Sequence, residues 1–131
     1  MSANRREIDE LEDWEFEDWV WEALDTLPRE FKSRFRNVQV VVQQEPTREQ
    51  LKSARVPHGH TLFGLYHGVP LTQRGMAAPL FPDVITIFRG PLTRHFRDRD
   101  AMRAQVRHTV LHEIAHFFGI SDDRLRELDA Y

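Results

Sequence analysis

The segment with the clearest chemical potential is His112-Glu113-Ile114-Ala115-His116. On a helix, His112 and His116 lie one turn plus about 40° apart, so both imidazoles can face one metal ion while Glu113 projects beside them. A zinc ion held in this way keeps a coordination position open for water, lowers the pKa of that water toward about 7, and needs a nearby carboxylate as base. The spacing therefore predicts that His112 and His116 bind zinc and that Glu113 is the general base.

Two further residues extend this pattern to H-E-x-x-H-x-x-G-x-x-D. From the composition, the shorter H-E-x-x-H motif arises by chance with a probability of about 3%, which falls to about 0.01% when Gly119 and Asp122 are also required. Gly119 ends the predicted helix and lets the chain turn sharply, which brings Asp122 back as a third ligand. Asp123 competes for that role, because a one-residue shift of the turn would exchange the two, and Glu127 is a more remote candidate. The alternative is that the motif residues are only the exposed face of a core helix.

Other residues near the motif have less specific roles. His108 lies one turn before His112 on the same helical face, either exposed or close to the metal. A His or Tyr near zinc could stabilise the oxyanion formed during attack on a carbonyl, which makes His67 and Tyr66 candidates. The chain has no cysteine, so the metal ligands must be nitrogen and oxygen atoms. Two His and one Asp suit zinc, although such a set also accepts other first-row ions.

The extended motif resembles the Asp-ligand form of the metzincin metallopeptidases. Four further segments resemble the small bacterial zincin-like metallopeptidases, or minimal zincins: LPREF (27–31), LFGLYHGVPLTQRG (62–75), IFRGPL (87–92) and SDDRL (121–125). The resemblance runs from about residue 27 to residue 128. It implies a small sheet packed on an active-site helix, zinc bound by His112, His116 and Asp122, Glu113 as the general base, and hydrolysis of peptide bonds. It implies no particular substrate.

The sequence departs from the metzincin pattern after the third ligand. Metzincins carry a methionine turn there, whereas Met1, Met76 and Met102 all precede the motif, and nine residues follow Asp122. A substrate cleft is therefore expected to be shallow and to be formed by the strands and the loop at 68–83. We expect an edge strand to hold an extended peptide by main-chain pairing.

The hydrophobic periodicity predicts helices at both ends of the chain and strands between them. Apolar residues three and four apart predict an amphipathic helix over 7–27, and Pro28 suits the first turn of a short second helix. Residues 38–44, 61–67 and 84–88 are predicted strands, 47–54 is a loop or a helical turn, and 68–83 is a long loop. From Arg97 to Gly119 a helical stripe appears, and a short capped helix follows Ser121. The stripe consists of Met102, Val106, Val110, Ile114 and Phe117.

This order of elements predicts an α+β minimal zincin. Its small mixed sheet of three to four strands would pack on the active-site helix, with N-terminal helices and a short C-terminal helix. The 131 residues suit one domain over 1–131. Within it, residues 1–27 form an acidic, Trp-rich N-terminal helix, and residues 28–131 form a core that holds the zinc motif at 112–122.

The charge distribution is asymmetric. Residues 1–30 carry 11 acidic and 3 basic side chains, whereas residues 31–131 carry 10 acidic and 15 basic ones. The N-terminal segment is therefore either an acidic arm that lies against a basic body or a solvated helix face. The same segment holds Trp14, Trp19 and Trp21, which either pack in the core or dock a partner.

Several partners and locations are not expected. The longest apolar runs are far shorter than the roughly 20 residues that span a bilayer, and the N-terminus has no apolar signal core, which favours the cytoplasm. The arginines between 94 and 107 are interrupted by Asp98 and Asp100 and lack an aromatic stacking platform. Nucleic-acid binding is therefore not expected.

Two hypotheses for function follow. The first is a zinc-dependent metallopeptidase with one Zn²⁺ per chain that acts on a peptide or protein substrate. The alternative is a zinc-binding interaction module with a weak or inactive site, which docks a protein partner through the acidic Trp-rich helix. The expected shallow cleft, which lacks a wall from the chain after the motif, and the acidic N-terminus are the features that favour the alternative.

Overall fold

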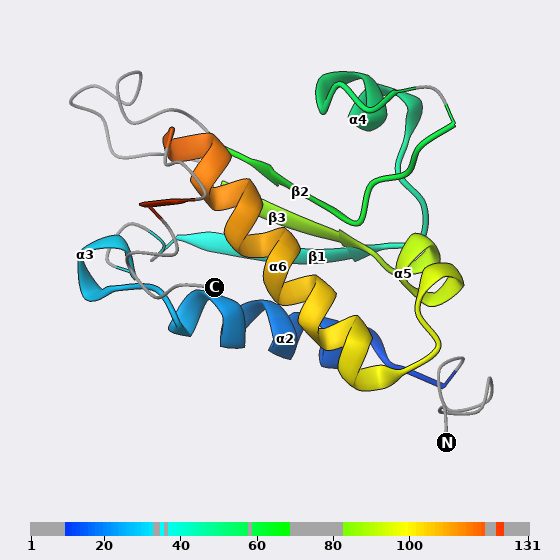
Figure 1. Ribbon diagram of the computed structural model, residues 1–131, viewed down its shortest axis with the longest axis horizontal. Helices are drawn as coiled ribbons and strands as arrows, with labels where there is room; N and C mark the ends of the chain where they lie inside the picture. Colours follow the sequence, from blue (N-terminus) through cyan, green and yellow to red (C-terminus); the bar gives the residue numbers. More distant parts are fainter. Residues whose placement is uncertain are drawn as a thin grey trace.

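The computed structural model describes residues 10–32, 35, 37–57, 59–68, 83–119 and 123–124. Its centre is a sheet of three strands, β1 (Val38–Gln43), β2 (Gly64–His67) and β3 (Asp83–Phe88), in the order β1-β3-β2. Strand β1 runs parallel to β3, and β2 runs antiparallel to it. Helices α2 (Asp13–Asp25) and α6 (Arg99–Phe118) lie side by side across one face of the sheet (Figure 1). This mixed sheet packed on helices confirms the predicted α+β class and the predicted small mixed sheet.

The core lies between the sheet and these two helices. Phe16 and Val20 of α2, with Ile87 of β3, are fully buried in it. The predicted stripe on α6 also faces this core, because its residues at 102, 106, 110 and 114 are at most 1% exposed. The Phe117 side chain, predicted to continue the stripe, lies outside the described residues. Helix α6 is therefore held in one rotational position by its buried stripe.

Local capping interactions explain where the long helices start and stop. Glu12 precedes α2 and forms a capping box with Glu15, which starts the helix six residues later than predicted. Asp98 caps α6 by accepting a hydrogen bond from the Asp100 N–H. Gly119 has φ of 68° and ends α6, as predicted, in the left-handed conformation that glycine adopts without strain.

Three short elements complete the described chain. Helix α3 (Arg29–Lys32) follows Pro28 as predicted. Helix α4 (Arg48–Ser53) resolves the open choice between loop and helix, because Thr47 accepts from the Gln50 N–H and the Gln50 side chain accepts from the Thr47 N–H. Helix α5 (Arg89–His95) was not predicted. The Arg-Gly-Pro segment at its start was expected only to end the preceding strand. Proline is compatible with a first helical turn, because an N–H there has no intrahelical partner.

Other predicted boundaries differ or remain undescribed. Strand β2 begins at Gly64, three residues after the predicted start. Most of the predicted 68–83 loop and of the C-terminal helix lies outside the described residues, although Asp123 and Arg124 are helical. No helix in the described part of the chain is long and apolar enough to cross a membrane.

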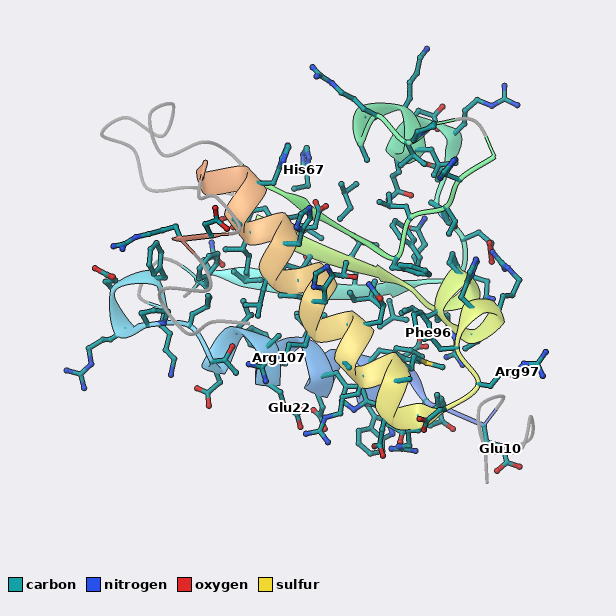
Figure 2. All side chains as sticks on the ribbon, in the orientation of Figure 1. Glu10, Glu22, His67, Phe96, Arg97 and Arg107 are labelled. Atoms are coloured by element: carbon teal, nitrogen blue, oxygen red, sulfur yellow. The ribbon has the colours of Figure 1, made fainter. Side chains whose placement is uncertain are left out.

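The acidic face of α2 lies against arginines of the rest of the chain. Asp13 pairs with Arg89, and Glu15 pairs with Arg99. Both guanidinium groups also lie over buried aromatic rings, Arg89 at 5.3 Å from the Phe16 ring centroid and Arg99 at 5.8 Å from that of Trp19. Further along α2, the Glu22 carboxylate accepts two hydrogen bonds from Arg103 of α6, on the side where the two helices meet (Figure 2). The prediction of an acidic arm against a basic body is therefore confirmed for these residues.

The three tryptophans divide between the core and the surface. Trp19 is 6% exposed and contacts Phe16 edge to face, with ring centroids 5.2 Å apart. Trp14 and Trp21, in contrast, are 58% and 45% exposed. Core packing therefore accounts for Trp19 and leaves two Trp rings on the surface.

This division makes a matched pair of stability predictions. Trp19→Ala removes a buried ring and leaves a cavity, so we expect it to lower the free energy of unfolding by about 3–5 kcal/mol. Trp14→Ala changes an exposed side chain of the same type on the same helix and should stay within about 0.5 kcal/mol of wild type. Urea denaturation followed by circular dichroism measures both, and equal losses would contradict the described packing of α2.

Candidate metal centre

The C-terminal half of α6 lies along β2 and carries His112, Glu113 and His116 (Figure 1). A glycine in the strand makes this approach possible. A Cβ built on Gly64 would lie 2.8 Å from Cγ2 of Thr109, which is too short for a side chain at that position. The missing side chain at Gly64 therefore lets the helix approach the strand closely. His112 and His116 are exposed, whereas Glu113 is half-buried.

Glu113 is connected directly to the edge of the sheet. The Tyr66 N–H donates to Glu113 Oε2 at 3.4 Å. Since backbone groups alternate between the two sides of an antiparallel strand, this N–H belongs to the side of β2 that faces away from β3. Burial raises the pKa of Glu113 above its ordinary value, although the hydrogen bond from Tyr66 and the charges of His116 and His112 act in the opposite direction.

The Tyr66 side chain points elsewhere. Its ring is buried, and its hydroxyl donates to Asp83 Oδ2 at 2.6 Å. A Cβ on Gly68 would lie 2.4 Å from Asp83 Oδ1, so the chain passes close to this buried carboxylate. The main chain of Tyr66 therefore faces the motif, while its phenol, a candidate oxyanion donor, is held in the interior. His67, the other candidate, is exposed at the end of β2 beside α6 (Figure 2).

His108 contacts the first histidine of the motif. The rings of His108 and His112 are stacked, with centroids 5.8 Å apart and an interplanar angle of 18°. The contact restricts the orientation of the His112 imidazole on an otherwise exposed helix face.

The motif residues form one wall of a cavity of about 690 Å³. The other walls are residues 65–68 of β2 and its end, and residues 53–55 at the end of α4. The strand wall was predicted, whereas the α4 wall was missed. Its signal was the Thr47-Arg48-Glu49-Gln50 segment, a capping box that predicts a helix start. The predicted contribution from the 68–83 loop falls mostly outside the described residues.

The chemistry of the described donors fits a zinc ion. Two imidazoles one helical turn apart line the same cavity as a half-buried carboxylate, and nitrogen and oxygen donors are common zinc ligands. The predicted third ligand, Asp122, and the remote candidate Glu127 lie outside the described residues, while Asp123 is exposed. Within the described residues, no group of three His, Cys, Asp or Glu side chains converges on a common metal position.

Comparisons with known proteins show the family and support the fold. Residues 35–131 match the family described as zincin-like metallopeptidases. A solved structure of a conserved hypothetical protein from T. thermophilus is 20% identical in sequence and has a TM-score of 0.50. The match covers 79% of this chain and 91% of that protein, and at this identity it supports the fold alone. No curated protein matches the sequence.

The environment of Glu113 predicts a pH effect in protein stripped of metal with a chelator. Because burial raises the pKa of Glu113 in the folded state, its contribution to stability is present below the ordinary value of 4.5 and is lost as the pH rises through the folded pKa. Glu113→Gln removes this loss, so the difference in free energy of unfolding between the variant and wild type should shift in favour of the variant over the range above pH 4.5. Denaturant titrations across this range measure the difference, and parallel profiles for the two proteins would contradict the burial of the carboxylate.

Proposed function

Because the chain belongs to the zincin-like metallopeptidase family, we propose that it is a zinc-dependent peptidase with Glu113 as its general base. The observation that carries the proposal is the position of His112, Glu113 and His116 on one wall of a cavity bordered by β2, an edge strand of the described sheet. Residues 1–131 form one zincin-like domain in this proposal, with an acidic N-terminal segment over 1–27 that contains α2 and a core over 28–131.

The metal ligands proposed are His112, His116 and Asp122, with one Zn²⁺ per chain. When bound, zinc would lower the pKa of a water molecule and polarise the carbonyl of the scissile peptide bond. Asp122 is preferred to Asp123 because its spacing after Gly119 matches the extended motif. The stacked His108 ring holds the His112 imidazole in place.

Glu113 performs the proton transfers. Its carboxylate accepts a proton from the attacking water and then donates that proton to the nitrogen of the leaving amine. The half-buried position supports this role, because a pKa raised by burial brings a carboxylate closer to the working pH of a base. The Tyr66 N–H fixes the carboxylate at the strand edge while the second oxygen stays available.

The substrate proposed is a peptide or a protein, bound in an extended conformation. In the described sheet, β2 is an edge strand whose residues 65–67 line the cavity, and its outward Tyr66 N–H is already bonded to Glu113. An extended peptide could pair with this edge and pass the motif residues. Neither a nucleic acid nor a membrane is a proposed partner.

Metal content tests the ligand set. We expect the untagged wild-type protein to contain near-equimolar zinc by elemental mass spectrometry, and His116→Ala and Asp122→Ala to lose most of it, since each removes one of three ligands. The matched control is Asp123→Ala, which changes the neighbouring carboxylate and should retain the metal. Zinc lost from Asp123→Ala and retained by Asp122→Ala would assign the third ligand to Asp123 instead.

Hydrolysis by the Glu113→Gln variant tests the base. The variant keeps every proposed ligand, so it should retain zinc while its cleavage of a fluorogenic peptide library falls by about 10²- to 10⁴-fold. The His60→Ala variant is a control, because His60 is exposed and lies outside the described cavity lining. Glu113→Gln with wild-type turnover on a cleaved peptide would show that another group is the base.

The alternative interaction module has one structural observation in its favour. Trp14 and Trp21 are exposed seven residues apart on α2, and so lie on one face of the helix. The other side of α2 is part of the core, so deleting the helix would unfold the chain rather than remove a docking face. Zinc binding without cleavage of any library peptide would favour this module over the peptidase.

A further inference from the structure

One cationic side chain lies on the cavity wall formed by α4. Arg55 lines the same cavity as His112, Glu113 and His116. Among the described residues of this lining it is the one Lys or Arg, and Glu113 is the one carboxylate. Arg55 therefore borders the same cavity of about 690 Å³ as the two proposed histidine ligands.

The backbone at Arg55 is in a conformation that arginine rarely adopts. Helix α4 ends with the Arg55 N–H donating to the Lys52 carbonyl at 3.1 Å and the Val56 N–H donating to the Leu51 carbonyl at 3.0 Å. This is the Schellman pattern, in which the residue after the cap is left-handed and is usually glycine. Arg55 takes that place with φ of 56°. The helix end does not need an arginine, so its presence calls for a reason outside the cap.

The Arg55 guanidinium also has no partner within the described part of the chain. Other arginines there are held by carboxylates, as Arg94 is by Glu45 and Arg103 is by Glu22, each through two hydrogen bonds. No hydrogen bond or ion pair of the Arg55 side chain is present among the described residues. Its donor groups are therefore available to a ligand in the cavity.

We propose that Arg55 forms an anion-binding subsite that selects substrates with a carboxylate close to the scissile bond. The planar guanidinium matches a carboxylate with two parallel hydrogen bonds, and this geometry gives orientation as well as affinity. The carboxylate comes either from an Asp or Glu side chain or from the C-terminus of the peptide. The proposal rests on the proposed peptidase function, because it assigns a substrate class to that site.

Cleavage of matched peptides tests the subsite. The zinc-loaded full chain is given fluorogenic peptides in which one Glu or Gln is scanned along an otherwise identical sequence, each with a free or an amidated C-terminus. We expect a higher kcat/KM for peptides with the carboxylate at one scanned position or at the C-terminus. The Glu/Gln scan and the comparison of free with amidated C-termini distinguish these two sources of the carboxylate. In Arg55→Gln, the ratio of kcat/KM for the anionic peptide to that for its neutral match should fall roughly 10- to 100-fold.

The control is Arg48→Gln, which neutralises an exposed arginine of the same helix outside the described cavity lining. Its ratio should equal that of wild type. A wild-type enzyme with equal preference for the two peptides, or an equal loss of preference in both variants, would overturn the subsite.

If no peptide is cleaved, the result counts against the proposed peptidase function but not by itself against the Arg55 subsite. A binding measurement then tests the subsite. Fluorescence anisotropy with Glu113→Gln protein should show tighter binding of carboxylate peptides than of their neutral matches, and the double variant with Arg55→Gln should lose this difference. Binding without such a difference would overturn the proposal. Arg55→Gly should also unfold at a higher urea concentration than wild type, whereas a lower one would assign Arg55 a structural role instead.

Discussion

The close approach of α6 to the edge strand β2 is the constraint on which the candidate site depends. Residue 64 faces Thr109 across a distance that leaves no room for a Cβ, so the helix lies directly against the strand. This contact brings Glu113 to the Tyr66 N–H across 47 residues of sequence. Strand β2 is in turn held in place by the buried hydrogen bond that the Tyr66 hydroxyl donates to Asp83 of β3. A glycine and a buried polar pair thus set the geometry of the candidate site on the surface.

The acidic N-terminal helix stabilises the same arrangement from the other side of α6. Its carboxylates pair with Arg99 and Arg103 in the first half of α6 and with Arg89 after β3. Exposed ion pairs contribute little individually, but two of these arginines also cover buried aromatic rings. At Arg89 and Arg99, ion pairing and packing over an aromatic ring therefore both hold α2 against the rest of the chain. The asymmetry that separates an acidic segment from a basic body in the sequence is largely an internal pairing in the fold.

The sequence predicted those features whose signals are local. The motif on α6, the buried stripe and the end at Gly119 all follow from spacing within about 20 residues, and all are present in the described helix. Helix α5 was missed because its Gly-Pro pair is compatible both with a break and with a first turn. The capping box at 47–50 was a local signal for α4 itself, but the place of α4 and Arg55 beside the motif and the Tyr66–Asp83 pair could not be predicted, because each depends on segments that meet only in three dimensions. The role of Asp122 as the third metal ligand stays a prediction.

The rotational phase of α6 explains why the two proposed histidine ligands and the proposed base differ in exposure. The buried positions 102, 106, 110 and 114 point one side of the helix into the core. His112 and His116 each lie two residues from a position of this stripe, about 200° around the helix, and so are exposed. Glu113 lies one residue from Ile114, about 100° away, where the helix meets β2. An insertion of one residue between Val110 and His112 would rotate the two imidazoles by about 100° relative to the part of the stripe before the insertion and carry them away from the cavity. The apolar stripe therefore specifies the site as strictly as the motif itself.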